Sequence, residues 1–166
     1  MNWVVQRVPG ARLLLVGPFD SPADEVEVRQ LIVDYGLENA VEVVGWVPFT
    51  DLPKWFARAD AGLVPWHTEE KLPPQIIPTK MFEYMAARLP VVASNRSTIR
   101  RFIHDLDCSL LVEPGDSQGF AEAIVYLLNH PAEAKEMGER GRKAVEKGYR
   151  WETEGEKLLA LYRQLA

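Results

Sequence analysis

Five short runs of apolar residues recur along the chain, and segments with helical periodicity separate them. Most of the runs lack the alternation of apolar and polar residues that marks a half-exposed strand. They are typical of strands covered on both faces of a parallel sheet. The runs occupy residues 13–16, 41–44, 62–64, 90–93 and 109–112. This alternation predicts an α/β fold with a doubly wound, mostly parallel, Rossmann-like sheet.

The segments between the runs place apolar residues three and four positions apart, which is the spacing of one face of a helix. Such stripes are formed by Val28, Leu31, Ile32 and Tyr35, by Leu52, Trp55, Phe56 and Ala59, and by Phe120, Ala123, Ile124, Leu127 and Leu128. Two helices then follow without a strand between them. The first spans about residues 132–146, and the second carries Leu158, Leu161, Tyr162 and Leu165 on one face. We expect a single domain over residues 1–166 with these extra C-terminal helices.

Composition and charge narrow the classes of function. Of the 166 residues, 47% are apolar and 26% are charged, which is ordinary for a globular domain. The formal net charge of −5 provides no basic stripe for nucleic-acid phosphates, although a few local donors suffice for a small anionic ligand. The single cysteine, Cys108, excludes an internal disulfide, and its apolar neighbours in sequence predict a buried thiol. With no signal peptide and no membrane-length apolar run, we expect a cytoplasmic domain.

The most informative segment is residues 73–87, which overlaps the longest irregular stretch, residues 66–77. Proline is tolerated at a helix start, so a helix should begin at Pro78 or Thr79. Its free N–H groups would form an anion site beside Lys80. Glu83 follows one turn later, and a carboxylate suits the paired hydroxyls of a ribose.

An equally weighted alternative needs no ligand at all. Lys80 and Glu83 are spaced for an ordinary surface ion pair, and Thr79 is a residue type that caps helices. The residues alone leave both readings open.

The same segment resembles a known family. Residues 78–86 (Pro-Thr-Lys-Met-Phe-Glu-Tyr-Met-Ala) and residues 89–94 (Leu-Pro-Val-Val-Ala-Ser) look like the donor-site signature of family 4 glycosyltransferases, the glycosyl transferases group 1. Residues 11–18 look like that family's second strand and glycine turn, and residues 41–48 like its third strand. Further matches lie at residues 113–116 and 149–152. The order and spacing of these pieces imply the C-terminal, nucleotide-sugar-binding half of a two-domain GT-B glycosyltransferase.

The resemblance implies a donor site for a UDP- or GDP-sugar, with no cofactor and no protein-bound metal. Glu83 would hold the ribose hydroxyls. Thr79 and Lys80, at the helix start marked by Pro78, would meet the phosphates.

The glycine turns complete this implied site. Trp46 and Val47, within residues 45–48, would lie against the base through main-chain groups. Gly17 would let the backbone approach the diphosphate closely.

Two positions depart from the family pattern. Where the family often has a second glutamate near the transferred sugar, this chain has Gln75, which can hydrogen-bond sugar hydroxyls but carries no charge. Where the family usually has a glycine after the motif helix, this chain has Arg88. A left-handed conformation there would cost about 1 kcal/mol relative to glycine. His67 also follows a strand and would reach the donor, but a solvent-exposed loop histidine is the simpler reading.

The largest departure is at the amino end. In the family, a strand with a Gly-Arg-like turn and a Lys-Gly loop precedes the segment matched by residues 1–9, and an acceptor-binding domain precedes that. We therefore expect a gap at the centre of the sheet, unpaired strand edges and reduced stability. The apolar face of the last helix should also be partly exposed.

The leading hypothesis is the donor domain of a retaining hexosyltransferase in polysaccharide biosynthesis, inactive on its own. Its acceptor would be a glycan, a small molecule or a membrane lipid held by the absent domain at the inner membrane face. One alternative is a non-catalytic subunit or fragment completed by a separate N-terminal partner. Another is a sugar-nucleotide epimerase, which shares the two-domain architecture.

Overall fold

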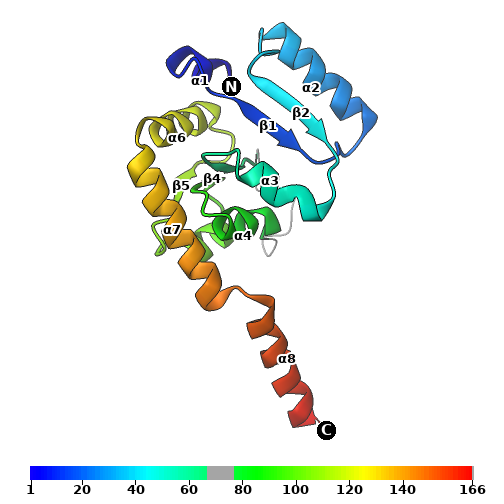
Figure 1. Ribbon diagram of the computed structural model, residues 1–166, viewed down its shortest axis with the longest axis vertical. Coiled ribbons are helices and arrows are strands. Elements are labelled where there is room, and N and C mark those ends of the chain that lie inside the picture. The colour runs from blue at the N-terminus through cyan, green and yellow to red at the C-terminus, as the bar shows by residue number, and fades with distance from the viewer. Residues whose placement is uncertain (67–76, 166) are drawn as a thin grey trace.

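The computed structural model describes residues 1–66 and 77–165, in which strands and helices alternate as the sequence predicts (Figure 1). In chain order the elements are α1 (Asn2–Arg7), β1 (Leu13–Val16), α2 (Pro22–Asp34), β2 (Val41–Gly45), η1 (Phe49–Asp51), α3 (Leu52–Phe56), β3 (Gly62–Val64), α4 (Thr79–Ala86), β4 (Val91–Ser94), α5 (Ser97–Ile103), β5 (Ser109–Val112), α6 (Ser117–Asn129), α7 (Pro131–Gly148) and α8 (Trp151–Leu165). Each strand coincides within one residue with an apolar run. The predicted α/β class is confirmed.

Every strand pair in the described part of the chain is parallel. Leu13 of β1 lies opposite Val41 of β2. In the second set, Gly62 of β3 lies opposite Val91 of β4, which in turn lies opposite Ser109 of β5. Parallel neighbours require crossover connections, and the helices between the strands supply them.

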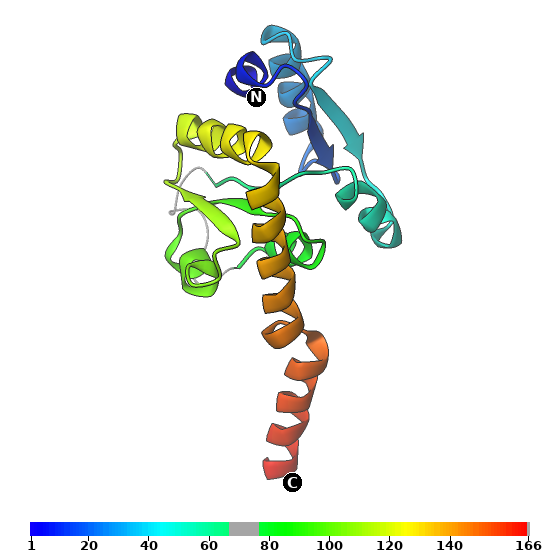
Figure 2. The same cartoon turned by 60° about the vertical axis from the view of Figure 1, so that its left-hand side comes forward.

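The strands form two sheets, β1-β2 and β3-β4-β5. In both views β1 lies between β2 and the three-stranded sheet (Figures 1 and 2). The division between β1 and β3 falls where the family's strand order predicts a gap.

The core is built around β4, whose Val91, Val92 and Ala93 are fully buried. α4 packs against β3 and β4, while α6 packs against β4 and β5. α4 contributes Met81 and Met85, both fully buried and four residues apart on one face of the helix. A helix that starts at Pro78 or Thr79 predicts Phe82, Met85 and Ala86 on the core face. Met81 is buried instead beside Met85, while Phe82 and Ala86 are half-buried.

α7 packs closely on the end of α4, and this contact depends on a glycine. A Cβ atom at Gly138 would overlap the backbone carbonyl of Arg88. Arg88 has a φ of 62°, the left-handed conformation expected from its place in the family's glycine position. The Arg142 guanidinium donates a 2.6 Å hydrogen bond to the carbonyl of Ala86, which satisfies a group at the helix end.

Two helices are less covered than their apolar stripes suggest. α2 has no buried residue, and Leu31 and Tyr35 of its predicted stripe are 44% and 58% exposed. α8 extends away from the rest of the chain (Figures 1 and 2) and also has no buried residue. The predicted exposure of its apolar face is confirmed for all four stripe residues.

Candidate donor site

The start of α4 has the geometry that the sequence predicts. Pro78 is buried and occupies the N-cap position with a φ of −68°, and the helix begins at Thr79. Thr79 is therefore inside the helix, and the reading of it as a cap is wrong. Among the described residues no side chain caps this helix start, and its first N–H groups are directed out of the helix.

Lys80 and Glu83 lie on the opposite side of α4 from the buried methionines. Lys80 is exposed and Glu83 is half-buried. Among the ion pairs of the described residues, none joins these two side chains, so the conformation does not show the surface pair of the alternative reading. Burial, and to a smaller extent the negative charge of the neighbouring Glu83, raises the pKa of Tyr84.

The two glycine turns at the ends of β1 and β2 are joined directly. Gly17 and Gly45 have φ values of 127° and 77°, which residues other than glycine rarely adopt. A Cβ atom added to either glycine would have no heavy atom within 4 Å. The Gly17 N–H donates a 2.8 Å hydrogen bond to the Gly45 carbonyl. The structure thus brings together two positions that the family resemblance implies for one site. Beside them, Val47 is half-buried and Trp46 is 71% exposed.

The structure also reveals an arrangement that sequence analysis missed, at the carboxyl ends of β3 and β4. The hydroxyl of the buried Ser94 accepts a 2.7 Å hydrogen bond from the Trp66 N–H and donates one of 3.1 Å to the Trp66 carbonyl. The guanidinium of Arg96 lies 4.2 Å from the centre of the Trp66 ring and is 2% exposed as a residue. The sequence did offer one signal for this arrangement. Arg96 directly follows an apolar run, at the edge of the sheet where such folds bind ligands.

The predicted residues therefore form two groups. Gly17, Trp46 and Val47 belong to the β1-β2 unit, while the helix start of α4 belongs to the larger unit. One link between them is α3, which follows the β2 turn and sets Phe56 edge-on against Tyr84 at 5.7 Å between ring centres. Gln75 and His67 lie outside the described residues.

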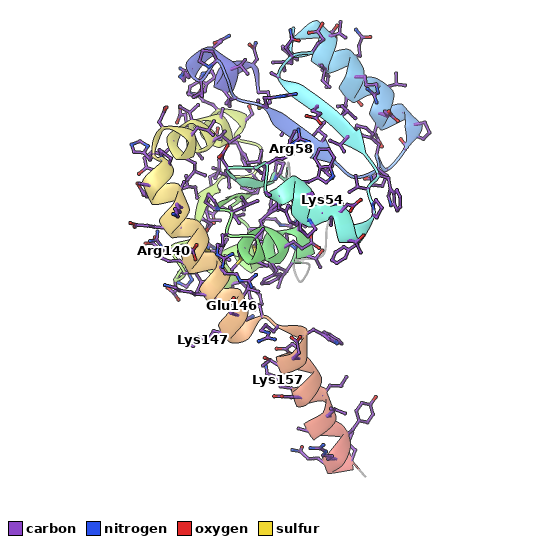
Figure 3. The ribbon with its side chains drawn as sticks, viewed as in Figure 1. Lys54, Arg58, Arg140, Glu146, Lys147 and Lys157 are labelled. Carbon is purple, nitrogen blue, oxygen red and sulfur yellow. The ribbon has the colours of Figure 1, made fainter. Side chains whose placement is uncertain are left out.

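Arg58, two residues after the end of α3, reaches the β1-β2 sheet (Figure 3). The Arg58 guanidinium donates a 2.8 Å hydrogen bond to Glu42 of β2 and lies 4.5 Å from the centre of the Trp55 ring. Glu42 also pairs with Arg12 at 3.4 Å. These contacts fix α3, and with it residues 45–48, against the smaller sheet.

Within the described residues, no three His, Cys, Asp or Glu side chains come together to hold a metal ion. In the same part of the chain, no helix combines the length and the apolar character needed to cross a membrane.

A doubly wound sheet with glycine turns and an uncapped helix start at its carboxyl edge defines a class of nucleotide-binding α/β domains. Residues 2–130 match the family model of glycosyl transferases group 1. The chain belongs to this family.

Curated relatives agree with this assignment. The chain is 32% identical over 142 residues to the amylovoran biosynthesis glycosyltransferase AmsK of Erwinia amylovora, covering 86% of this chain and 33% of that protein. It is 30% identical over 159 residues to a GDP-mannose-dependent alpha-(1-6)-phosphatidylinositol monomannoside mannosyltransferase of Mycobacterium tuberculosis, covering 95% and 40%. The chain thus spans well under half the length of these relatives.

Solved structures share the fold. Sucrose-phosphate synthase from Thermosynechococcus elongatus superimposes with a TM-score of 0.83 at 29% identity, over 99% of this chain and 41% of that one. Anabaena HepE in complex with UDP superimposes with a TM-score of 0.80 at 21% identity, over 99% and 45%. The predicted resemblance to the C-terminal half of a GT-B glycosyltransferase is confirmed.

Proposed function

We propose that this chain is the nucleotide-sugar-binding domain of a retaining glycosyltransferase that uses a UDP- or GDP-hexose. The observation that carries the proposal is the start of α4, where no described side chain caps the first N–H groups and where Lys80 and Glu83 lie on the side away from the core. The family match supports it. So do the names of two similar proteins, one using GDP-mannose and one solved with UDP.

In this proposal the diphosphate lies at the start of α4. The N–H groups at Thr79 and Lys80 donate to its oxygens, and the Lys80 ammonium offsets their charge. Gly17 contributes from the other unit, because a turn without a side chain lets the backbone approach an oxygen closely. A helix start can bind a phosphate even when the domain as a whole is negatively charged. The formal net charge of −5 is therefore compatible with this site.

The nucleoside would then extend toward the smaller sheet. Glu83, one turn along α4, accepts hydrogen bonds from the two ribose hydroxyls. The main-chain groups of Trp46 and Val47 meet the base. Gln75 would lie near the transferred sugar.

The contribution to catalysis would be positional and electrostatic. When the bond between the anomeric carbon and the diphosphate oxygen breaks, the leaving diphosphate gains negative charge. Lys80 and the helix start would stabilise that charge. The acceptor would come from a further domain, so we expect this chain alone to transfer no sugar. A lipid acceptor at the inner membrane face is consistent with the phosphatidylinositol mannoside in one relative's name.

A second candidate is a non-catalytic subunit or fragment completed by a separate N-terminal partner. The divided sheet and the uncovered apolar face of α8 favour it. In that case, nucleotide binding would require the partner.

Titration of the purified chain with UDP and with GDP by calorimetry tests the donor site. We expect one of them to bind and Glu83→Ala to weaken binding about tenfold or more, because hydrogen bonds to a charged group contribute about 1.5–3 kcal/mol. Glu122→Ala on α6 is the matched control. Removing a carboxylate from an acidic domain favours an anionic ligand, so a loss specific to Glu83→Ala is not a charge effect. Absence of binding to a folded chain would contradict the donor-site proposal and favour the partner-completed subunit.

A further inference from the structure

Arg96 is a buried cation to which the proposed donor site gives no role. It is the N-cap residue of α5, and its main-chain N–H donates a 2.8 Å hydrogen bond to the carbonyl of Ser94. Its guanidinium lies over the ring of Trp66. Burying a guanidinium carries a desolvation cost that an apolar side chain of similar volume would avoid. Packing alone therefore does not explain why an arginine occupies this position.

Trp66, two residues after the end of β3, is held at both its main chain and its ring. Its N–H and its carbonyl each form a hydrogen bond with the hydroxyl of the buried Ser94, at 2.7 and 3.1 Å. Its ring lies against Arg96, and such a stack of a cation on an aromatic face strengthens when both groups are removed from water. Two residues that follow each other closely at the end of β4 thus give Trp66 a single orientation.

The position of Trp66 affects the start of α4 through the core. Trp66 and Ile77 both pack against the core cluster that contains the fully buried Met81. Ile77 directly precedes Pro78, and the Met81 N–H donates a 3.1 Å hydrogen bond to the Pro78 carbonyl. Because interiors are close-packed, a shift of the Trp66 ring would displace these side chains and, with them, the helix start that carries Lys80.

We propose that Arg96 is a positioning residue of the donor site. By stacking on Trp66 it fixes the start of α4 in the orientation that binds the diphosphate, and this inference rests on the proposed function. In this role Arg96 contacts Trp66 and not the nucleotide. Lysine cannot replace it, because an ammonium group is not planar and does not stack on an aromatic ring as a guanidinium does.

The first test needs no nucleotide and follows hydrogen exchange of single amides by NMR in the parent, Arg96→Lys and Arg96→Met. Methionine fills a similar volume without a charge, so this variant should fold. We expect the amides of Trp66 and Met81 to exchange about tenfold faster in both variants. The Val91 amide, bonded to a carbonyl of β5's neighbouring turn in the core, should keep the parent's rate, which separates a local shift from a general loss of stability. Arg101→Met, at an exposed position of α5, is the matched control and should change nothing.

The second test measures affinity by calorimetry for whichever of UDP and GDP the parent binds. We expect Arg96→Met, Arg96→Lys and Trp66→Leu each to weaken binding about tenfold, because a small displacement of a binding group is enough for such a loss. The double variant Arg96→Met/Trp66→Leu should bind no more weakly than the weaker single variant, since both changes remove the same support. Arg101→Met should bind like the parent.

The outcomes separate this role from the alternatives. Additive losses in the double variant would overturn the proposal, because Arg96 would then act independently of Trp66. Full binding by Arg96→Lys would also overturn it and assign the role to charge alone. Parent-like binding by a folded Arg96→Met would overturn it and leave the donor site intact. Failure of the parent to bind either nucleotide would instead contradict the donor site, and the exchange rates would still decide whether Arg96 fixes the start of α4.

Discussion

Arg88 occupies a backbone conformation that favours glycine, so we expect substitutions at this position to change the stability of the chain. Its φ of 62° is left-handed, and its side chain makes an exposed 3.1 Å ion pair with Glu139. Arg88→Ala removes the ion pair but keeps the strain, while Arg88→Gly removes both. We expect Arg88→Gly to be about 1 kcal/mol more stable than Arg88→Ala in urea unfolding. Equal stability of the two variants would show that the turn carries no strain.

Cys108 predicts how stability changes at alkaline pH. Burial of this thiol raises its pKa from 9.0 to about 11, and its side chain is fully buried. The folded state therefore holds the proton more tightly than the unfolded state. This contribution to stability is complete below pH 9 and is lost as pH rises toward 11. This contribution to the free energy of unfolding is about 2–3 kcal/mol, because each unit of pKa difference between the folded and unfolded states corresponds to about 1.4 kcal/mol.

The measurement is the free energy of unfolding of the parent and of Cys108→Ala between pH 8 and 11. The cavity left by the substitution lowers stability by the same amount at every pH. The difference between the two proteins should therefore shrink as pH rises. Tyr84 and Tyr126, whose pKa values are also raised, are present in both and cancel. A difference that stays constant with pH would show that the thiol does not ionise on unfolding.

Sequence reasoning located single residues well where backbone chemistry decides the outcome. Pro78 determines where α4 begins, and Gly17 and Arg88 have the backbone conformations that their positions require. Arg96 was missed because its burial depends on Trp66, which is 30 residues away in the sequence and meets it only through the pairing of β3 with β4. Periodicity carries no information about such a contact.

At the scale of elements, the packing of α7 leads us to expect that Gly138 cannot be replaced without loss of stability. Alanine normally stabilises a helix by about 1 kcal/mol relative to glycine. At Gly138, however, the added Cβ would overlap the backbone carbonyl of Arg88, and backbone cannot move aside as a flexible side chain does. We expect Gly138→Ala to lower the free energy of unfolding by about 2 kcal/mol or more.

Gly155→Ala in α8 is the control for Gly138→Ala, because nothing lies within 4 Å of its added Cβ. It should increase helicity by circular dichroism without lowering stability. If Gly138→Ala proved as harmless as Gly155→Ala, the close approach of α7 to the Arg88 turn would be wrong.

The strands were predictable and the extent of their coverage was not. The run at residues 90–93 is apolar throughout because helices cover both faces of β4, and all four residues are buried. Residues 13–16 have the same pattern, yet each is only half-buried. The sequence of apolar residues in a strand indicates only that its side chains are suited to apolar contacts. Whether a neighbour is present depends on the division of the sheet, which a run of apolar residues does not encode.

At the scale of the whole molecule, the two groups of the candidate site belong to units that no strand pairing joins in the described part of the chain. The start of α4 rests on the well-packed three-stranded sheet, whereas the glycine turns rest on the smaller β1-β2 sheet. The contact between Phe56 and Tyr84 and the packing of α1 on α6 hold the units together. A nucleotide that bridges the groups would stabilise this arrangement, because a ligand that binds only the assembled site shifts the folding equilibrium toward it.

α8 gives the last prediction, because it is a helix without a surface to pack on. Its side chains at Trp151, Leu158, Leu161, Tyr162 and Leu165 are between 48% and 78% exposed, and none of its residues is buried. Truncation after Arg150 keeps Tyr149, whose ring packs 5.1 Å from that of Phe82. We expect the truncated chain to unfold with a free energy within about 0.5 kcal/mol of the parent.

The same truncation should reduce concentration-dependent association measured by light scattering, because it removes a large apolar surface. Truncation after Asn129 is the control. It also removes α7, whose Ala134 and Met137 are buried in the core, and should leave the chain unfolded. A large loss of stability on removing α8 alone would mean that this helix packs on the domain in solution. Unchanged association would mean that its apolar face is not what brings chains together. If both expectations hold, the apolar stripe of α8 contributes nothing to the fold of its own domain, and its sequence is then explained by a surface outside this chain.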